Sequence, residues 1–120
     1  MAQILVIDDE YDIRIALRKM LEHAGYDVIE ASNGREGIRI FTQNTVDLII
    51  TDIFMPEKDG VEILLELRAD YPSAKIIAIS GRGHGYLPIA REFGAIRTLF
   101  KPFRQSDVLK AVTEALAAQP

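Results

Sequence analysis

Leu48-Ile49-Ile50-Thr51-Asp52 is an apolar run that ends on a single carboxylate. Its length and its β-branched residues are typical of a strand that is buried on both faces, as in the middle of a parallel sheet. In open α/β sheets, ligands bind outside the carboxyl ends of the strands. The position of Asp52 therefore predicts that this carboxylate is the reacting group of a functional site.

Four further apolar runs predict four further strands, at residues 3–7, 27–30, 75–80 and 98–100. Apolar residues at helical spacing predict a helix from residue 13 to 24, ended by Gly25. Further helices are expected from Asn33, after Gly60, from Pro88 to Phe93, and from residue 105 or 106. This alternation indicates right-handed crossovers and a five-stranded parallel sheet with helices on both faces. The predicted fold class is α/β and doubly wound.

Two of the predicted helices have distinctive residues. Asn33 is a favoured N-cap residue, whereas Gly34 and Gly37 are expected to weaken the helix that follows it. The apolar face of the last helix is expected to include Leu109, Val112 and Leu116.

The composition is that of one ordinary globular domain. The chain has 120 residues, 48% of them hydrophobic and 27% charged, and residues 1–120 are expected to form a single domain. A formal net charge of −4 gives no reason to expect direct nucleic-acid binding. The absence of cysteine excludes disulfides and thiolate chemistry. With neither a membrane-length apolar segment nor a signal peptide, a cytoplasmic protein without membrane contact is expected.

Several carboxylates follow strands that a doubly wound sheet would place side by side. In the common strand order 2-1-3-4-5, strands one and three are neighbours, and their carboxyl ends carry Asp8, Asp9 and Asp52. Carboxylates so close together need a cation, and Mg²⁺ favours carboxylate oxygens, waters and phosphate. Lys101 follows the fifth strand and Ser80 ends the fourth, so an ammonium group and a hydroxyl are expected at the same edge.

Taken together, these residues resemble the receiver domain of two-component response regulators. The resemblance covers the whole chain and includes the acidic pair and the central aspartate. It also rests on the segments Met55-Pro56, Asp59-Gly60, Ser80-Gly81 and Lys101-Pro102-Phe103. The resemblance implies the flavodoxin-like, CheY-like fold with the strand order 2-1-3-4-5.

The resemblance also implies a phosphorylation site with a metal ion. Asp52 would accept a phosphoryl group from the phosphohistidine of a sensor histidine kinase or a phosphotransfer protein. Asp9 and Asp52, with the backbone carbonyl of Phe54, would ligate Mg²⁺ directly. Asp8 would act through a water molecule.

Two further residues would hold the phosphoryl oxygens, namely Ser80 and Lys101. The peptide between Lys101 and Pro102 is expected to be cis, as in relatives. Relatives usually carry Tyr or Phe three residues before the lysine, whereas this chain has Thr98. The conformational response to phosphorylation is therefore expected to be small or differently routed. Phe100 shares the strand face of Thr98 because side chains alternate along a strand.

The expected output is a changed contact with a downstream protein rather than turnover of a substrate. The protein itself is expected to be a monomer or a weak dimer. Phosphorylation would alter the affinity of a surface near Ser80, Arg91, Arg97 and Arg104 for that partner.

Each feature taken alone has an ordinary structural explanation, and two other functions stay open. Asp8, Asp9 and Glu10 precede a helix, where acidic side chains cap amide groups and favour the helix dipole. An aspartyl-phosphate hydrolase of the haloacid dehalogenase type would need Asp-x-Asp after the first strand, whereas residues 8–10 read Asp-Asp-Glu. Thr98 keeps open a degenerate receiver that binds partners without phosphorylation. The joint placement at four strand ends favours the phosphoacceptor.

Overall fold

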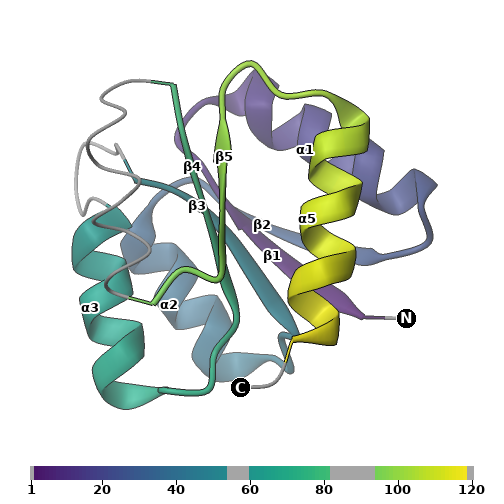
Figure 1. The fold of residues 1–120 in the computed structure, drawn as a ribbon. Helices are drawn as coiled ribbons and strands as arrows, with labels where there is room; N and C mark the ends of the chain where they lie inside the picture. Colours follow the sequence, from purple (N-terminus) through teal and green to yellow (C-terminus); the bar gives the residue numbers. More distant parts are fainter. Residues whose placement is uncertain (1, 54–59, 82–93, 119–120) are drawn as a thin grey trace.

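Five parallel strands form one sheet in the order β2-β1-β3-β4-β5 (Figure 1). The computed structural model describes residues 2–53, 60–81 and 94–118. The strands are β1 (Gln3–Ile7), β2 (Asp27–Ala31), β3 (Leu48–Asp52), β4 (Ile76–Ser80) and β5 (Arg97–Phe100). The predicted α/β class and strand order are confirmed, and the predicted strand boundaries differ by one residue at the end of β2 and at the starts of β4 and β5.

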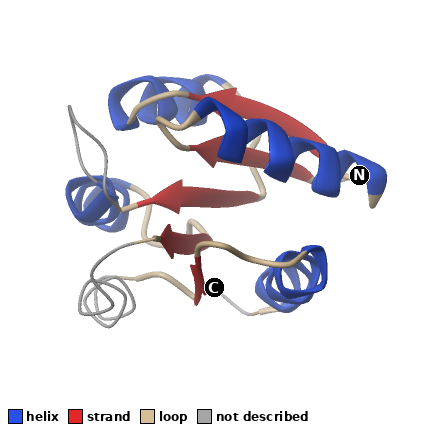
Figure 2. Cartoon of the chain, turned by 90° about the horizontal axis from the view of Figure 1, so that it is seen from above, coloured by secondary structure: helices blue, strands red, loops and turns tan. Residues whose placement is uncertain are grey.

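Helices cover both faces of the sheet. The described helices are α1 (Tyr11–His23), α2 (Gly34–Gln43), α3 (Gly60–Asp70) and α5 (Gln105–Ala117). α1 and α5 pack on one face, whereas α2 and α3 pack on the other, so the strands lie between two helical layers (Figure 2). The helix predicted at residues 88–93 lies outside the described residues. Within the described ranges, every helix is too short or too polar to span a bilayer.

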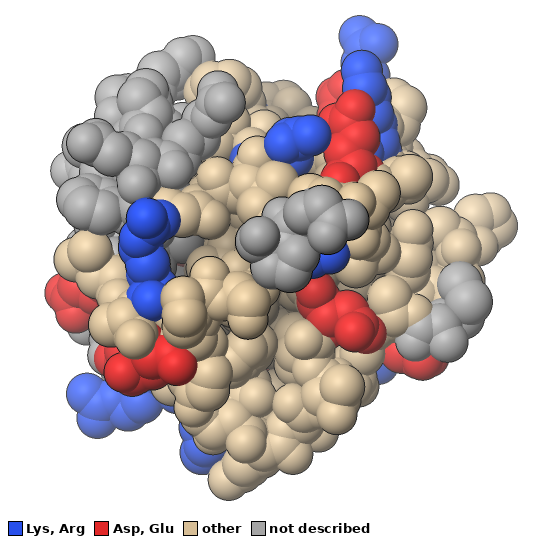
Figure 3. Space-filling model, turned by 60° about the horizontal axis from the view of Figure 1, so that its bottom comes forward, with Lys and Arg blue, Asp and Glu red and all other residues tan. Residues whose placement is uncertain are grey.

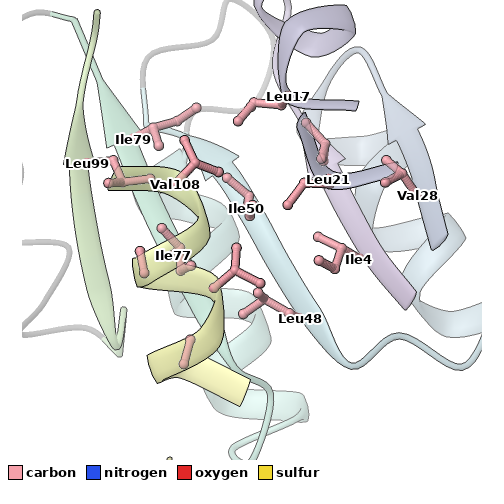
Figure 4. Packing of buried hydrophobic residues seen from close by; sticks show 14 residues of the cluster. Ile4, Leu17, Leu21, Val28, Leu48, Ile50, Ile77, Ile79, Leu99 and Val108 are labelled. Atoms are coloured by element: carbon pink, nitrogen blue, oxygen red, sulfur yellow. The ribbon is translucent and has the colours of Figure 1, made fainter. Parts of the chain in front are cut away.

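Side chains that alternate along the strands divide between two cores. On β1, Ile4 and Val6 belong to the core under α1 and α5, whereas Leu5 and Ile7 belong to the core under α2 and α3. The first of these cores is drawn in Figure 4, where side chains from α1, α5 and the strands converge. Because both faces of the central strands are buried, their sequences are continuous apolar runs.

The buried face of α5 differs from the predicted one. Leu109 and Leu116 are only half-buried at the edge of the core. The side chains that face the sheet recur every three or four residues and are mostly small, which lets the helix approach closely. They are Val108, Ala111, Val112 and Ala115.

α2 begins at the predicted cap, since Asn33 Oδ1 accepts a hydrogen bond from the Glu36 amide (2.8 Å). Gly37 has a packing role that the sequence does not indicate. A Cβ atom at this position would lie 2.8 Å from Cγ1 of Ile7, which is too close for two carbon atoms. The glycine thus lets α2 pack against β1 at the residue that precedes Asp8.

The ends of the described chain lie at the amino edge of the sheet, opposite the carboxyl end of β3 (Figure 1). β1 begins at Gln3. The last turn of α5 lies beside the start of β4, where Lys75 Nζ donates to the carbonyl of Leu116 (2.9 Å). In the view of Figure 3, in which the bottom of the molecule comes forward, basic and acidic side chains lie among one another.

Candidate functional site

Strand pairing places Asp8 beside Asp52. Ile7 pairs with Thr51 in the ladder between β1 and β3, so the residues that follow them occupy neighbouring positions at the carboxyl edge. By alternation, both carboxylates lie on the face of the sheet that α1 and α5 cover. Asp8 is 0% exposed and Asp52 is 3% exposed. Two buried carboxylates therefore meet at the point where the sequence predicts the reacting group.

Lys101 brings an ammonium group to the same place. Its amide donates to the carbonyl of Ser80 (2.9 Å), which continues the pairing of β4 with β5 by one residue. Its Nζ lies 2.7 Å from Asp52 Oδ2, 3.0 Å from Asp8 Oδ2 and 2.9 Å from Glu10 Oε1. One ammonium group thus contacts three carboxylates. The peptide between Lys101 and Pro102 is cis, as predicted.

Glu10 is a member of the site that the sequence does not single out. It occupies the N-cap position of α1, and its side chain is 60% exposed. Its only sequence signal is its place directly after the acidic pair, which does not reveal that the side chain turns toward Lys101. Carboxylate oxygens of four residues lie within 4.8 Å of one another, and these residues are Asp8, Asp9, Glu10 and Asp52.

Burial and mutual contact set the charges of the site. Burial raises the pKa of Asp8 to about 6, with a smaller contribution from the charge of Asp52. The Glu10 amide, which donates to Asp8 Oδ1 (2.9 Å), and the Lys101 ammonium group oppose this rise in pKa. Burial alone would lower the pKa of Lys101, but its contacts with Asp52, Glu10 and Asp8 raise that pKa above its ordinary value. The ammonium group is therefore charged at physiological pH.

The donor set of the site fits a magnesium ion. Asp8 Oδ2 is buried and, of the side-chain atoms that the structure describes, it alone is buried without a well-aligned hydrogen bond. Lys101 Nζ is its ion-pair partner at 3.0 Å, so the oxygen keeps capacity for a further ligand or a water. Carboxylate oxygens are the ligands that Mg²⁺ prefers. Asp8, Asp9 and Asp52 all belong to the cluster, whereas Phe54 lies outside the described residues.

Ser80 and Gly81 lie beside the backbone of Lys101 at the carboxyl end of β4. Ser80 ends β4, is buried, and pairs with Phe100, the residue before Lys101. A Cβ atom on Gly81 would lie 3.3 Å from the Cβ of Lys101, which is tighter than ordinary contact. The glycine therefore leaves the lysine stem room to reach the carboxylates.

Comparison with known proteins gives one consistent family. Residues 4–113 match the response regulator receiver domain. The chain is 34% identical over 117 residues to the chemotaxis protein CheY of Listeria monocytogenes, with 96% of this chain and 98% of the relative covered. It is 31% identical over 115 residues to the sporulation initiation phosphotransferase F of Bacillus subtilis, with 95% of this chain and 93% of the relative covered.

Solved structures agree with the sequence comparison. A response regulator receiver domain protein from Clostridium thermocellum superimposes with a TM-score of 0.91 at 38% identity, covering 97% of this chain and 94% of that one. The response regulator TrrA of Thermotoga maritima, in complex with Mg²⁺ and BeF, superimposes with a TM-score of 0.88 at 33% identity. That match covers 96% of this chain and 99% of TrrA.

Proposed function

Because this chain belongs to the response regulator receiver domain family of two-component signalling, we propose that residues 1–120 act as one receiver that is phosphorylated on Asp52. The observation that carries the proposal is the surroundings of this residue. Its carboxylate is buried within an acidic cluster, with Lys101 Nζ 2.7 Å from Oδ2. An isolated turn aspartate would need neither the burial nor the cation.

The proposed reaction transfers a phosphoryl group from the phosphohistidine of a sensor histidine kinase or a phosphotransfer protein. A carboxylate oxygen of Asp52 attacks phosphorus, the new O–P bond forms as the P–N bond breaks, and the imidazole nitrogen keeps the electron pair. Lys101 is charged and already contacts Asp52. After phosphorylation its ammonium group would form an ion pair with a phosphoryl oxygen. The Ser80 hydroxyl would donate to another.

The carboxylates of the cluster would hold the metal ion. Asp9 and Asp52 would be direct ligands together with the Phe54 carbonyl, and Asp8 would act through a water. When bound, Mg²⁺ would neutralise the carboxylates and the negative charge on the phosphoryl oxygens. The buried and incompletely hydrogen-bonded Asp8 Oδ2 supports this arrangement.

Receiver domains of this family are signalling switches rather than turnover enzymes, so the hydrolase alternative is wrong. The proposed output is a protein contact beside β5. A groove between β5 and α5 is lined by Arg97, Phe100, Phe103 and Lys110, among others, and Phe100 is 47% exposed. Arg97 lines this groove and Arg104 is the N-cap residue of α5, whereas Arg91 lies outside the described residues.

The proposal is tested by intact-mass measurement after incubation with acetyl phosphate, with and without Mg²⁺. The wild type is expected to gain one phosphoryl group only when Mg²⁺ is present. Asp52→Asn removes the nucleophile and is expected to gain none. Asp27→Asn is the matched control, because this exposed aspartate starts β2 at the opposite edge of the sheet, and it should be labelled like the wild type.

Labelling of Asp52→Asn would contradict the assignment of the acceptor. If the wild type gains no phosphoryl group from acetyl phosphate, the same measurement with a phosphorylated histidine kinase follows. A chain that no donor labels would be a phosphorylation-independent interaction module.

A further inference from the structure

Arg14 links the acidic segment between β1 and α1 to the neighbouring strand β2. Its Nη1 donates to the backbone carbonyl of Asp8 (2.8 Å), and its Nε forms an ion pair with Glu30 Oε1 (3.1 Å). The Arg14 side chain is only 14% exposed. A guanidinium group with two donors in a planar fork can hold two acceptors in a fixed relative position.

The carbonyl that Arg14 holds belongs to the peptide group between Asp8 and Asp9. The preceding peptide is fixed by the sheet, since the Asp8 amide donates to the carbonyl of Ala31 (3.1 Å). The Glu10 amide donates to Asp8 Oδ1 (2.9 Å). The Asp8–Asp9 peptide joins the two residues from which both carboxylates extend, and Arg14 holds its carbonyl from the side of β2.

Arg14 is itself held in place by its neighbours. Glu30 also pairs with Arg18 Nη1 (2.6 Å), and Arg18 pairs in turn with Glu22 (3.2 Å). Hydrogen bonds from Arg18, and to a smaller extent from Arg14, hold the pKa of Glu30 below its ordinary value. The guanidinium carbon of Arg14 lies 5.5 Å from the centre of the Tyr11 ring, which favours this placement by a cation–π contact.

We propose that Arg14 is a positioning residue for the metal site, which it acts on through the Asp8–Asp9 peptide rather than through its charge. This inference rests on the proposed function, because it assumes that the acidic cluster binds Mg²⁺. A positioning role and a purely electrostatic role predict opposite changes in Mg²⁺ affinity when Arg14 is replaced. A positive charge near the site opposes a divalent cation, so removal of a mere charge would strengthen Mg²⁺ binding. Removal of a positioning group weakens it.

The test compares Arg14→Gln with Arg18→Gln in a titration of the full chain with Mg²⁺, without a phosphoryl donor. Both variants lose one positive charge and one partner of Glu30, but only Arg14 reaches the Asp8 carbonyl. We expect the Kd for Mg²⁺ to rise about ten-fold in Arg14→Gln, as for other residues that orient metal ligands. In Arg18→Gln the Kd should be unchanged or slightly lower.

A second readout needs no metal. The Glu10 amide donates to Asp8 Oδ1, so its hydrogen exchange, measured by NMR without Mg²⁺, reports the geometry of the acidic segment. Exchange should be faster in Arg14→Gln than in the wild type and in Arg18→Gln. Unchanged Glu10 exchange together with unchanged or tighter Mg²⁺ binding in Arg14→Gln would overturn the inference. If the wild type binds no Mg²⁺, the proposed function fails instead. Hydrogen exchange of the Glu10 amide then decides by itself whether Arg14 positions the acidic segment.

Discussion

Asp8 uses its two carboxylate oxygens differently. Oδ1 accepts the Glu10 amide at the start of α1, whereas Oδ2 is buried against Lys101. The ordinary explanation of the acidic pair, in which an acidic side chain caps the amide groups before a helix, therefore holds for one oxygen. The other oxygen belongs to the site. The fold holds this carboxyl group in place, while burial disfavours its charged form.

Asp8→Asn is expected to raise the free energy of unfolding at neutral pH in the absence of Mg²⁺. The pKa of Asp8 rises from 3.8 to about 6 on folding, so the folded state binds this proton more tightly than the unfolded state. The resulting stabilisation is complete below the unfolded pKa and is lost as the pH rises through the folded pKa. Urea unfolding should show the variant more stable by on the order of 2 kcal/mol at neutral pH. Near the unfolded pKa the two proteins should converge, and a pH-independent difference would contradict this account.

Lys101→Met is expected to destabilise the metal-free protein and to strengthen Mg²⁺ binding. The lysine side chain is 11% exposed and its Nζ contacts three carboxylates, so its loss leaves their repulsion uncompensated. We expect a loss of about 2 kcal/mol in the free energy of unfolding, which Mg²⁺ restores. Transfer from acetyl phosphate should slow by roughly 100-fold, because a pre-placed positive group is lost.

The control for this substitution is Lys110→Met, which removes an exposed lysine of α5. Urea unfolding with and without Mg²⁺ measures the effect. If Mg²⁺ stabilises the wild type and Lys101→Met equally, the ammonium group does not compete with the metal.

At the scale of the elements, the strands could be predicted closely and the helix faces less so. The strands are continuous apolar runs because both of their faces are buried. On α5, however, the sequence offers two overlapping apolar stripes that share Val112. One contains the larger residues Leu109 and Leu116, and the other contains Val108 and Ala115. The short distance between helix and sheet favours the smaller side chains. That distance cannot be predicted from the sequence of the helix alone.

Gly37→Ala is expected to destabilise the protein although alanine favours helices by about 1 kcal/mol. The new methyl group would meet the side chain of Ile7 at 2.8 Å from its Cγ1, and overpacking of this kind costs about 1 to 3 kcal/mol. Urea unfolding measures the change. Ile7→Val, which shortens the opposing side chain, should recover part of the loss in the double variant. Additive effects of the two substitutions would show that they do not meet.

At the scale of the whole molecule, the residues that follow strands could be placed from the sequence. Parallel strands end at one edge of the sheet, and this topology alone places Asp8, Asp52 and Lys101 at that edge. Contacts that depend on the path of a long side chain could not be predicted in this way. Glu10 turns back to Lys101, and Arg14 crosses from α1 to β2; both contacts exist only after the layers have packed.

Thr98 lies in β5 where relatives usually carry Tyr or Phe, and it is half-buried. Its small side chain cannot move between an inward and an outward position as a ring can. On addition of beryllofluoride and Mg²⁺, we expect NMR shifts close to the acidic cluster and only small shifts in β5 and α5. Thr98→Tyr should extend them along β5. Shifts that already spread through β4, β5 and α5 in the wild type would show that another residue, such as Phe100 on the same strand face, carries the response.

The described chain starts and finishes at one edge of the sheet, and the acidic cluster lies at the other. A tether attached near either end would therefore hold the molecule with its reactive edge pointing outward. Immobilisation on a sensor surface, or fusion to a fluorescent reporter, should leave the approach of a large donor protein unobstructed. The same geometry makes the domain suitable as a module in a longer engineered chain, whichever side the added segment is joined to.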